Sequence, residues 1–259
     1  MNVAKQNIAF YLPSLMEILR DSDPEWEKID KLFSAKIEER FKEANCEVIT
    51  IEATIFDIII AVKKQNLQAI RLLDFLNRMT TELSANLNND EKLLIGKIVK
   101  DLLLTLDMRY LNFVGEIGVL NNLIKSKTYR LEAVEAELSD STKTIDFKLK
   151  RIGDGAFLLV EVVNIHLDSD RIEDDEEKIK KFLTHRLTKK IDSKKTKSQF
   201  YLIPVIWCAS KELKIYSDYF KKHKMHIENV IEPVSYLTFI DPNDESFVLH
   251  KFANISNLF

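Results

Sequence analysis

Asp146 and Glu161 are the two residues of this chain whose types and spacing could most readily do chemistry. They lie in two β-rich segments, 143–152 and 156–165, on either side of a Gly-Asp-Gly sequence. A two-residue turn at Gly153 and Asp154 would place Asp146 directly opposite Glu161. Directly opposed Cβ atoms lie about 5 Å apart, and two carboxylates this close repel unless a divalent cation binds them. The hairpin therefore predicts a site for Mg²⁺ or Mn²⁺.

Further polar residues could complete this site. A symmetric turn at 139–142 would place Glu135 opposite Asp146, as a third metal-binding carboxylate or as a solvated strand residue. Lys148 points to the same face as Asp146, two residues along the strand. Glu116 lies in GEIGVL, within a predicted helix at 110–126. Two alternatives remain open: Glu116 as a buried acid paired with an arginine, and the two hairpin acids in ion pairs with lysines across the sheet.

The elements that would position these residues follow from the hydrophobic pattern. Residues 1–108 predict an all-helical domain, with a short β-prone segment at 46–51. Residues 109–259 predict an α/β domain that contains the candidate site. Its segments are a helix at 110–126, strands at 129–138, 143–152 and 156–165, a basic helix at 178–197, a strand at 200–208, a helix at 212–223 and a β-like segment at 229–240.

Composition narrows the class of protein. The chain has 259 residues, 31% of them charged, with a net charge of −3. Neither half is broadly basic, which argues against non-specific coating of nucleic acid. Cys46 and Cys208 have no partner spacing and predict reduced thiols in a cytoplasmic protein. No apolar run is long enough to span a membrane, and no signal peptide is evident.

The basic helix allows two interpretations. Nine Lys and Arg residues fall between positions 178 and 197, against one acidic residue. The run is either a solvated helix face or a track for phosphates beside the acidic hairpin. In the second interpretation the partner is nucleic acid, DNA rather than RNA, bound through Lys178, Lys181, Arg186, Lys189 and Lys190. The helical half could bind a protein partner.

The order helix, three strands, helix, strand, with acids at set places, resembles the PD-(D/E)XK nuclease superfamily. The matching positions are Glu116 in GEIGVL, Asp146 in TIDF and Glu161 in VEVV, and the resemblance covers roughly residues 110–210. It implies a restriction-endonuclease-like αβββαβ core with a mixed central sheet. It also implies catalysis by Glu116, Asp146 and Glu161 in a metal-dependent endonuclease that hydrolyses DNA, with Mg²⁺ or Mn²⁺ held by Asp146 and Glu161. The symmetry of the turn at 139–142 adds Glu135 as a candidate third metal ligand.

One departure concerns the lysine of the family motif, which should fall at position 163, where this chain has Val163. In the family that lysine is thought to activate water and to stabilise charge on the phosphate. Lys148, or Lys178 or Lys181 at the start of the basic helix, could replace it. The alternative function is an inactive nuclease-fold module that binds nucleic acid or a protein partner.

Overall fold

The structure is a computed structural model, and it describes residues 2–20, 22, 24–42, 54–107, 109–166, 175–209, 234–239 and 248–253, with four single positions between 215 and 222. The chain forms two compact units, Met1–Asn121 and Asn122–Phe259. The predicted division after residue 108 comes before helix α7, whereas the two units divide inside that helix. The predicted segment at 46–51 and most of the predicted helix at 212–223 lie outside the described residues.

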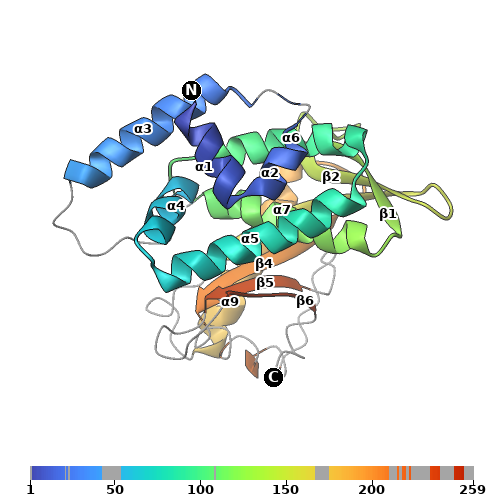
Figure 1. The fold of residues 1–259 in the computed structure, drawn as a ribbon. Helices are drawn as coiled ribbons and strands as arrows, with labels where there is room; N and C mark the ends of the chain where they lie inside the picture. Colours follow the sequence, from blue (N-terminus) through green and yellow to red (C-terminus); the bar gives the residue numbers. More distant parts are fainter. Residues whose placement is uncertain are drawn as a thin grey trace. The chain divides into compact units, whose positions relative to one another are not determined.

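The first unit is built from helices, as the hydrophobic periodicity predicts. Asn66 begins one of them by accepting a hydrogen bond from the amide of Ala69 at 2.9 Å, and Asn88 and Glu91 form a capping box at the start of the next. Its described helices (Figure 1) are α1 (Val3–Tyr11), α2 (Pro13–Ile18), α3 (Trp26–Lys42), α4 (Ile55–Lys63), α5 (Leu67–Asn86), α6 (Asn89–Leu104) and α7 (Tyr110–Lys125), which continues into the second unit.

The second unit is an α/β structure around a mixed sheet, which confirms the predicted fold class. Its elements are β1 (Tyr129–Glu137), β2 (Thr144–Arg151), β3 (Phe157–His166), α9 (Glu176–Lys194), β4 (Tyr201–Ala209), β5 (Val234–Phe239) and β6 (Val248–Ala253). The strands follow one another in the order β1 to β6. β1, β2 and β3 are antiparallel, and β3 then pairs in parallel with β4 after the crossover through α9.

The hairpin register agrees with the sequence prediction, but the turn does not. Phe147 pairs with Val160 and Lys150 with Phe157, as predicted. The amide of Arg151 donates to the Ala156 carbonyl at 2.8 Å, so the loop has four residues rather than the predicted two. Gly155 has φ +72°, a conformation that favours glycine. The predicted two-residue turn and the observed four-residue loop are both centred between Gly153 and Asp154. Both therefore give the same facing pairs, and the register was predicted correctly although the turn was not.

α9 covers one face of the sheet with an apolar stripe. Ile179, Leu183 and Leu187 recur every four residues and are buried against Val163 and Ile165 of β3. β3 is therefore an interior strand: β2 and β4 flank it, and α9 packs on one of its faces. Burial of these side chains fixes α9 relative to the strand that carries Glu161.

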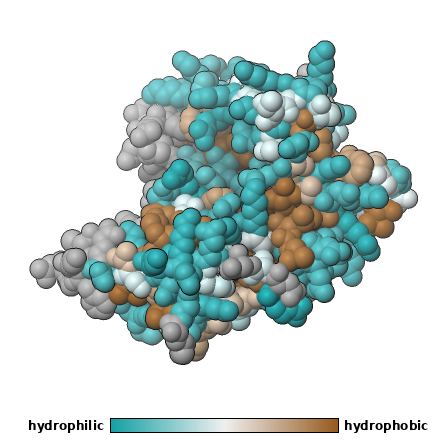
Figure 2. Space-filling model, turned by 90° about the horizontal axis from the view of Figure 1, so that it is seen from above, coloured by the Kyte–Doolittle hydropathy of each residue, from teal (hydrophilic) through white to brown (hydrophobic). Residues whose placement is uncertain are grey.

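The surface agrees with a composition rich in charged residues. Hydrophilic side chains cover much of the face drawn in Figure 2, and hydrophobic side chains appear there in separate groups. Among the residues that the structure describes, no helix has the length and apolarity needed to cross a membrane.

Candidate active site

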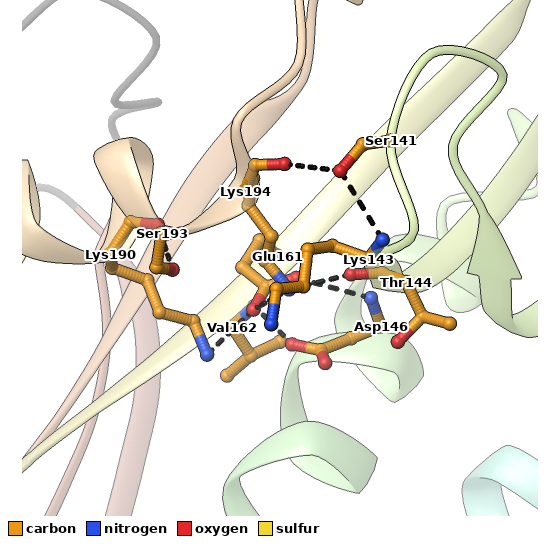
Figure 3. A network of polar contacts seen from close by, with 9 residues as sticks. All are labelled: Ser141, Lys143, Thr144, Asp146, Glu161, Val162, Lys190, Ser193 and Lys194. Atoms are coloured by element: carbon orange, nitrogen blue, oxygen red, sulfur yellow. Dashed lines mark hydrogen bonds and ion pairs between the residues drawn. The ribbon is translucent and has the colours of Figure 1, made fainter.

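Asp146 and Glu161 meet where β2 and β3 separate. The ladder between these strands ends at the pair Phe147 and Val160. Beyond it, the amide of Val162 donates to Asp146 Oδ2 at 2.7 Å, and the amide of Asp146 donates to Glu161 Oε2 at 3.3 Å (Figure 3). At this point the backbone amides of β2 and β3 donate to carboxylate oxygens, and not to the carbonyl oxygens of the opposite strand as in a regular ladder. Each acid is held by the backbone of the opposite strand, so the predicted pair does come together.

Glu161 is fully buried and its charge is balanced by two lysines of α9. Its side chain is 0% exposed, and the Nζ atoms of Lys190 and Lys194 both lie 2.6 Å from its Oε1 atom. The two lysines differ in exposure, because 37% of the Lys190 side chain is accessible but only 11% of that of Lys194. Ion pairs were one of the alternatives left open by the sequence, and the lysines that form them come from the helix rather than the sheet.

The turn between β1 and β2 holds the end of α9 in place. The Ser141 hydroxyl donates to the Lys194 carbonyl at 2.7 Å, and Lys194 Nζ donates to the Thr144 carbonyl at 2.6 Å. Asp140, in the same turn, accepts hydrogen bonds from the Thr196 hydroxyl and the Lys197 amide, which lower the pKa of its carboxyl. These bonds fix the last turn of the helix, and with it the two ammonium groups at Glu161.

The pKa of Asp146 is raised to about 6, chiefly by burial and then by the charge of Glu161. Lys190, the hydrogen bond from the Val162 amide and Lys194 act in the opposite direction without cancelling the rise. At neutral pH the carboxylate is therefore ionised in a place that disfavours its charge. A bound cation would relieve that cost.

The raised pKa of Asp146 gives a pH dependence of stability. Between about pH 4 and pH 6 the folded chain keeps a proton that the unfolded chain releases, so the free energy of unfolding falls as pH rises. Without divalent ions, we expect wild type to lose on the order of 2 kcal/mol relative to Asp146→Asn between pH 4 and pH 7. Urea unfolding of both proteins at several pH values measures this. A difference in free energy of unfolding between wild type and Asp146→Asn that is the same at every pH would contradict this prediction.

The other sequence candidates lie in different surroundings. Val163, 5% exposed, packs in the cluster under α9, where a motif lysine would be buried among apolar side chains. The Lys148 ammonium lies 4.1 Å from the centre of the Phe157 ring rather than at the acids. Lys178 forms an ion pair with Asp175 at 3.8 Å and Lys181 is exposed, so a role for either in place of the motif lysine stays a prediction. The lysines that contact Glu161 are Lys190 and Lys194.

Glu116 and Glu135 stay predictions as site residues. Glu116 is half-buried in α7, within the first unit. Glu135 is exposed on β1, and the neighbouring pairs, Val134 with Phe147 and Ala136 with Ile145, place it across from Asp146. In the described part of the chain, no group of three His, Cys, Asp or Glu side chains could hold a metal ion.

Sequence reasoning missed Lys194 and gave Lys190 a different role, as one of several DNA contacts. A signal for both was present. Positions 190 and 194 lie three and seven residues after Leu187, on the side of α9 that carries the buried stripe, and both residues are lysines. A lysine beside an apolar stripe either reaches water or is paired with an acid, because an unpaired buried ammonium is costly. Glu161 is that acid.

The donors at the site suit Mg²⁺ or Mn²⁺ in kind. Two carboxylates from adjacent strands supply hard oxygen ligands, and Mg²⁺ is often bound by one or two carboxylates together with water and phosphate. Asp146 Oδ1 accepts no hydrogen bond from the described residues, whereas Glu161 Oε1 already contacts two ammonium groups. A cation at Glu161 would share that oxygen with the buried Lys194 or displace the more exposed Lys190.

Comparison with known proteins adds no relative. No protein-family model, no curated protein and no solved structure matches this chain.

Proposed function

We propose that this chain is a metal-dependent nuclease-like enzyme that hydrolyses phosphodiester bonds of DNA. The observation that supports this most is the placement of Lys190. Its partly exposed ammonium lies 2.6 Å from the carboxylate of Glu161, which is bonded to the backbone of Asp146. Two acids and a lysine, the groups that the family motif combines, are thus together although position 163 is valine.

Each residue has a separate task in this proposal. Asp146 and Glu161 hold the divalent ion, and the strand amides fix the direction of both carboxylates. Lys190 is accessible enough to contact a phosphate oxygen and to orient a water molecule. Lys194 is buried, so it positions Glu161 and does not contact substrate. When bound, the metal ion supplies a more acidic water molecule and stabilises charge on the phosphate.

The outer surface of α9 offers contacts for the DNA backbone. Lys178, Lys181 and Lys189 are exposed and lie on one side of the helix by their spacing. Arg186 is also exposed, and it donates to the Asn164 carbonyl at 3.2 Å. We infer that these side chains contact phosphates beside the acids, as the basic run suggests.

The role of Lys190 is tested by Lys190→Met. We expect cleavage of plasmid and oligonucleotide DNA with Mg²⁺ or Mn²⁺ to slow by about 10- to 100-fold, because the water-orienting and phosphate-binding charge is gone. Lys180→Met removes an exposed lysine from the same helix and should change the rate less than about twofold.

Equal rates for Lys190→Met, Lys180→Met and wild type would exclude Lys190 from the chemistry. Activity that persists in excess EDTA would remove the metal from the proposal. If the wild type cleaves neither single-stranded DNA, duplex DNA nor RNA with either metal, the enzymatic proposal is wrong and a second candidate function, a binding module, remains.

That second candidate is an inactive nuclease-fold module that binds nucleic acid, or binds a protein partner through the helical unit. One observation favours it: Glu161 Oε1 already has two ammonium groups at 2.6 Å, so the buried charge is balanced without a metal. Calorimetric titration with Mn²⁺ separates the candidates. Binding that is lost in Asp146→Asn supports the enzyme, and no heat in the wild type supports the module.

A further inference from the structure

The far end of the β2–β3 hairpin carries a second feature on the face that holds Glu161. Phe157 and Leu159 alternate with their neighbours on β3 so that both point to the side of Glu161, and Leu159 packs against the cluster under α9. Phe157 is 54% exposed. At about 3.3 Å per residue it lies roughly 13 Å along the strand from Glu161.

Three cationic residues lie on the two strands beside this exposed ring. Lys150 pairs directly with Phe157 across the hairpin and with Arg130 on its other side. The Lys148 ammonium lies over the ring, 4.1 Å from its centre. We refer to Arg130, Lys148, Lys150 and Phe157 as the Phe157 patch.

The cationic side chains of the Phe157 patch have no acidic partner among the described residues. In the part of the chain that the structure describes, no acidic side chain forms an ion pair with Arg130, Lys148 or Lys150. Arg151, the next residue along β2, differs from them because it forms an ion pair with Asp154 at 3.1 Å. Like charges directly opposite each other on a sheet are unfavourable. An anionic ligand over Arg130 and Lys150 would remove that repulsion.

We propose that the Phe157 patch binds a single-stranded segment of nucleic acid, with one base stacked on Phe157 and the adjacent phosphates on Lys150 and Arg130. Exposed aromatic rings beside cations bind single strands, because an unpaired base offers a face to the ring. The bases of an intact duplex are already stacked on each other. The Lys148 ammonium contacts one face of the Phe157 ring, and the exposed part of the ring remains available for stacking with the base.

This inference rests on the proposed function, since it supplies the substrate of the same site. The patch lies on the strand face that carries Glu161, so a single strand bound there can lead toward the acids. The substrate class is then single-stranded DNA or the unpaired end of a duplex, rather than uninterrupted duplex.

Fluorescence anisotropy with a labelled oligo(dT) of about 20 nucleotides, in EDTA and low salt, tests the patch without any cleavage. We expect Phe157→Leu to weaken binding about tenfold and Phe157→Trp to keep or improve it, because tryptophan also offers a ring. Arg130→Gln combined with Lys150→Gln should weaken binding and lower the salt dependence by about 0.7 for each phosphate that is no longer bound. Lys31→Gln, at an exposed helix position, is the control and should leave binding unchanged.

Several outcomes would overturn the inference. They are equal loss of binding in Phe157→Leu and Phe157→Trp, tighter binding of uninterrupted duplex than of oligo(dT), and competition by an acidic peptide at equal charge. Thermal unfolding of each variant establishes that it is folded. Oligo(dT) that binds through the patch in EDTA, but is not cleaved when excess Mg²⁺ or Mn²⁺ is added in a separate assay, would overturn only the enzymatic proposal. Cleavage that persists without patch-dependent binding would overturn only this inference.

Discussion

Asp146→Asn is expected to lower the rate of metal-dependent DNA cleavage on the order of 10²- to 10³-fold. The variant loses one negative charge of the metal site, and a charge contribution of about 3–4 kcal/mol at the transition state corresponds to that range. Asparagine can still accept the hydrogen bond from the Val162 amide through its side-chain oxygen, so the junction of β2 and β3 is kept. The comparison of cleavage rates in Mg²⁺ and Mn²⁺ measures the loss.

A matched variant separates chemistry from folding. Glu137→Gln removes an exposed acid from β1 and should leave the rate within about twofold of wild type. Asp146→Asn should unfold no more easily than wild type at pH 7 or above, because the ionised carboxyl is disfavoured in its buried place. Cleavage at the wild-type rate by Asp146→Asn would show that another site, or a contaminating nuclease, is responsible.

Glu161→Gln is expected to lower the free energy of unfolding of the second unit by about 3–5 kcal/mol. The substitution leaves the ammonium groups of Lys190 and Lys194 beside a neutral amide, and Lys194 is only 11% exposed. Removing one partner of a buried ion pair has this cost because the remaining charge stays buried without compensation. The melting temperature should fall on the order of 10 °C.

The two tryptophans make this measurement specific. Trp26 lies in the first unit and Trp207, which is buried, in the second, and the chain has no others. In a Trp26→Phe background, urea unfolding followed by fluorescence reports on Trp207 alone. Adding Lys194→Met to Glu161→Gln should recover part of the lost stability, since a buried charge is removed. A loss below about 1 kcal/mol in the single variant would contradict the prediction.

The fold of the second unit could be predicted because its signals are local. Strand alternation and symmetric turns determine which residues face each other, so Asp146 and Glu161 were paired without any tertiary information. The same symmetry placed Glu135 across from Asp146, through the turn between β1 and β2. The length of the β2–β3 loop was predicted incorrectly because Gly153, Asp154 and Gly155 allow several tight turns.

The source of the lysine could not be predicted in the same way. Because position 163 is valine, β3 supplies no lysine there, and which lysines reach Glu161 depends on how α9 lies across the sheet. The sequence predicted that a replacement for the motif lysine could come from the start of the basic helix, as Lys178 or Lys181. The apolar stripe of α9 instead brings its C-terminal turn to Glu161, and only Lys190 and Lys194 of the described residues form ion pairs with it. Attention to lysines inside the stripe, rather than to the density of charge, would have identified them.

The hydrogen bond from the Val162 amide to Asp146 makes that amide a natural spectroscopic probe of the site. Its proton is held by a carboxylate whose pKa is about 6, so its NMR chemical shift should titrate near that pH. Any cation that binds Asp146 withdraws electron density from the oxygen and should move the same resonance. One backbone signal can therefore follow protonation, metal loading and displacement of Lys190, with no label attached to the protein surface.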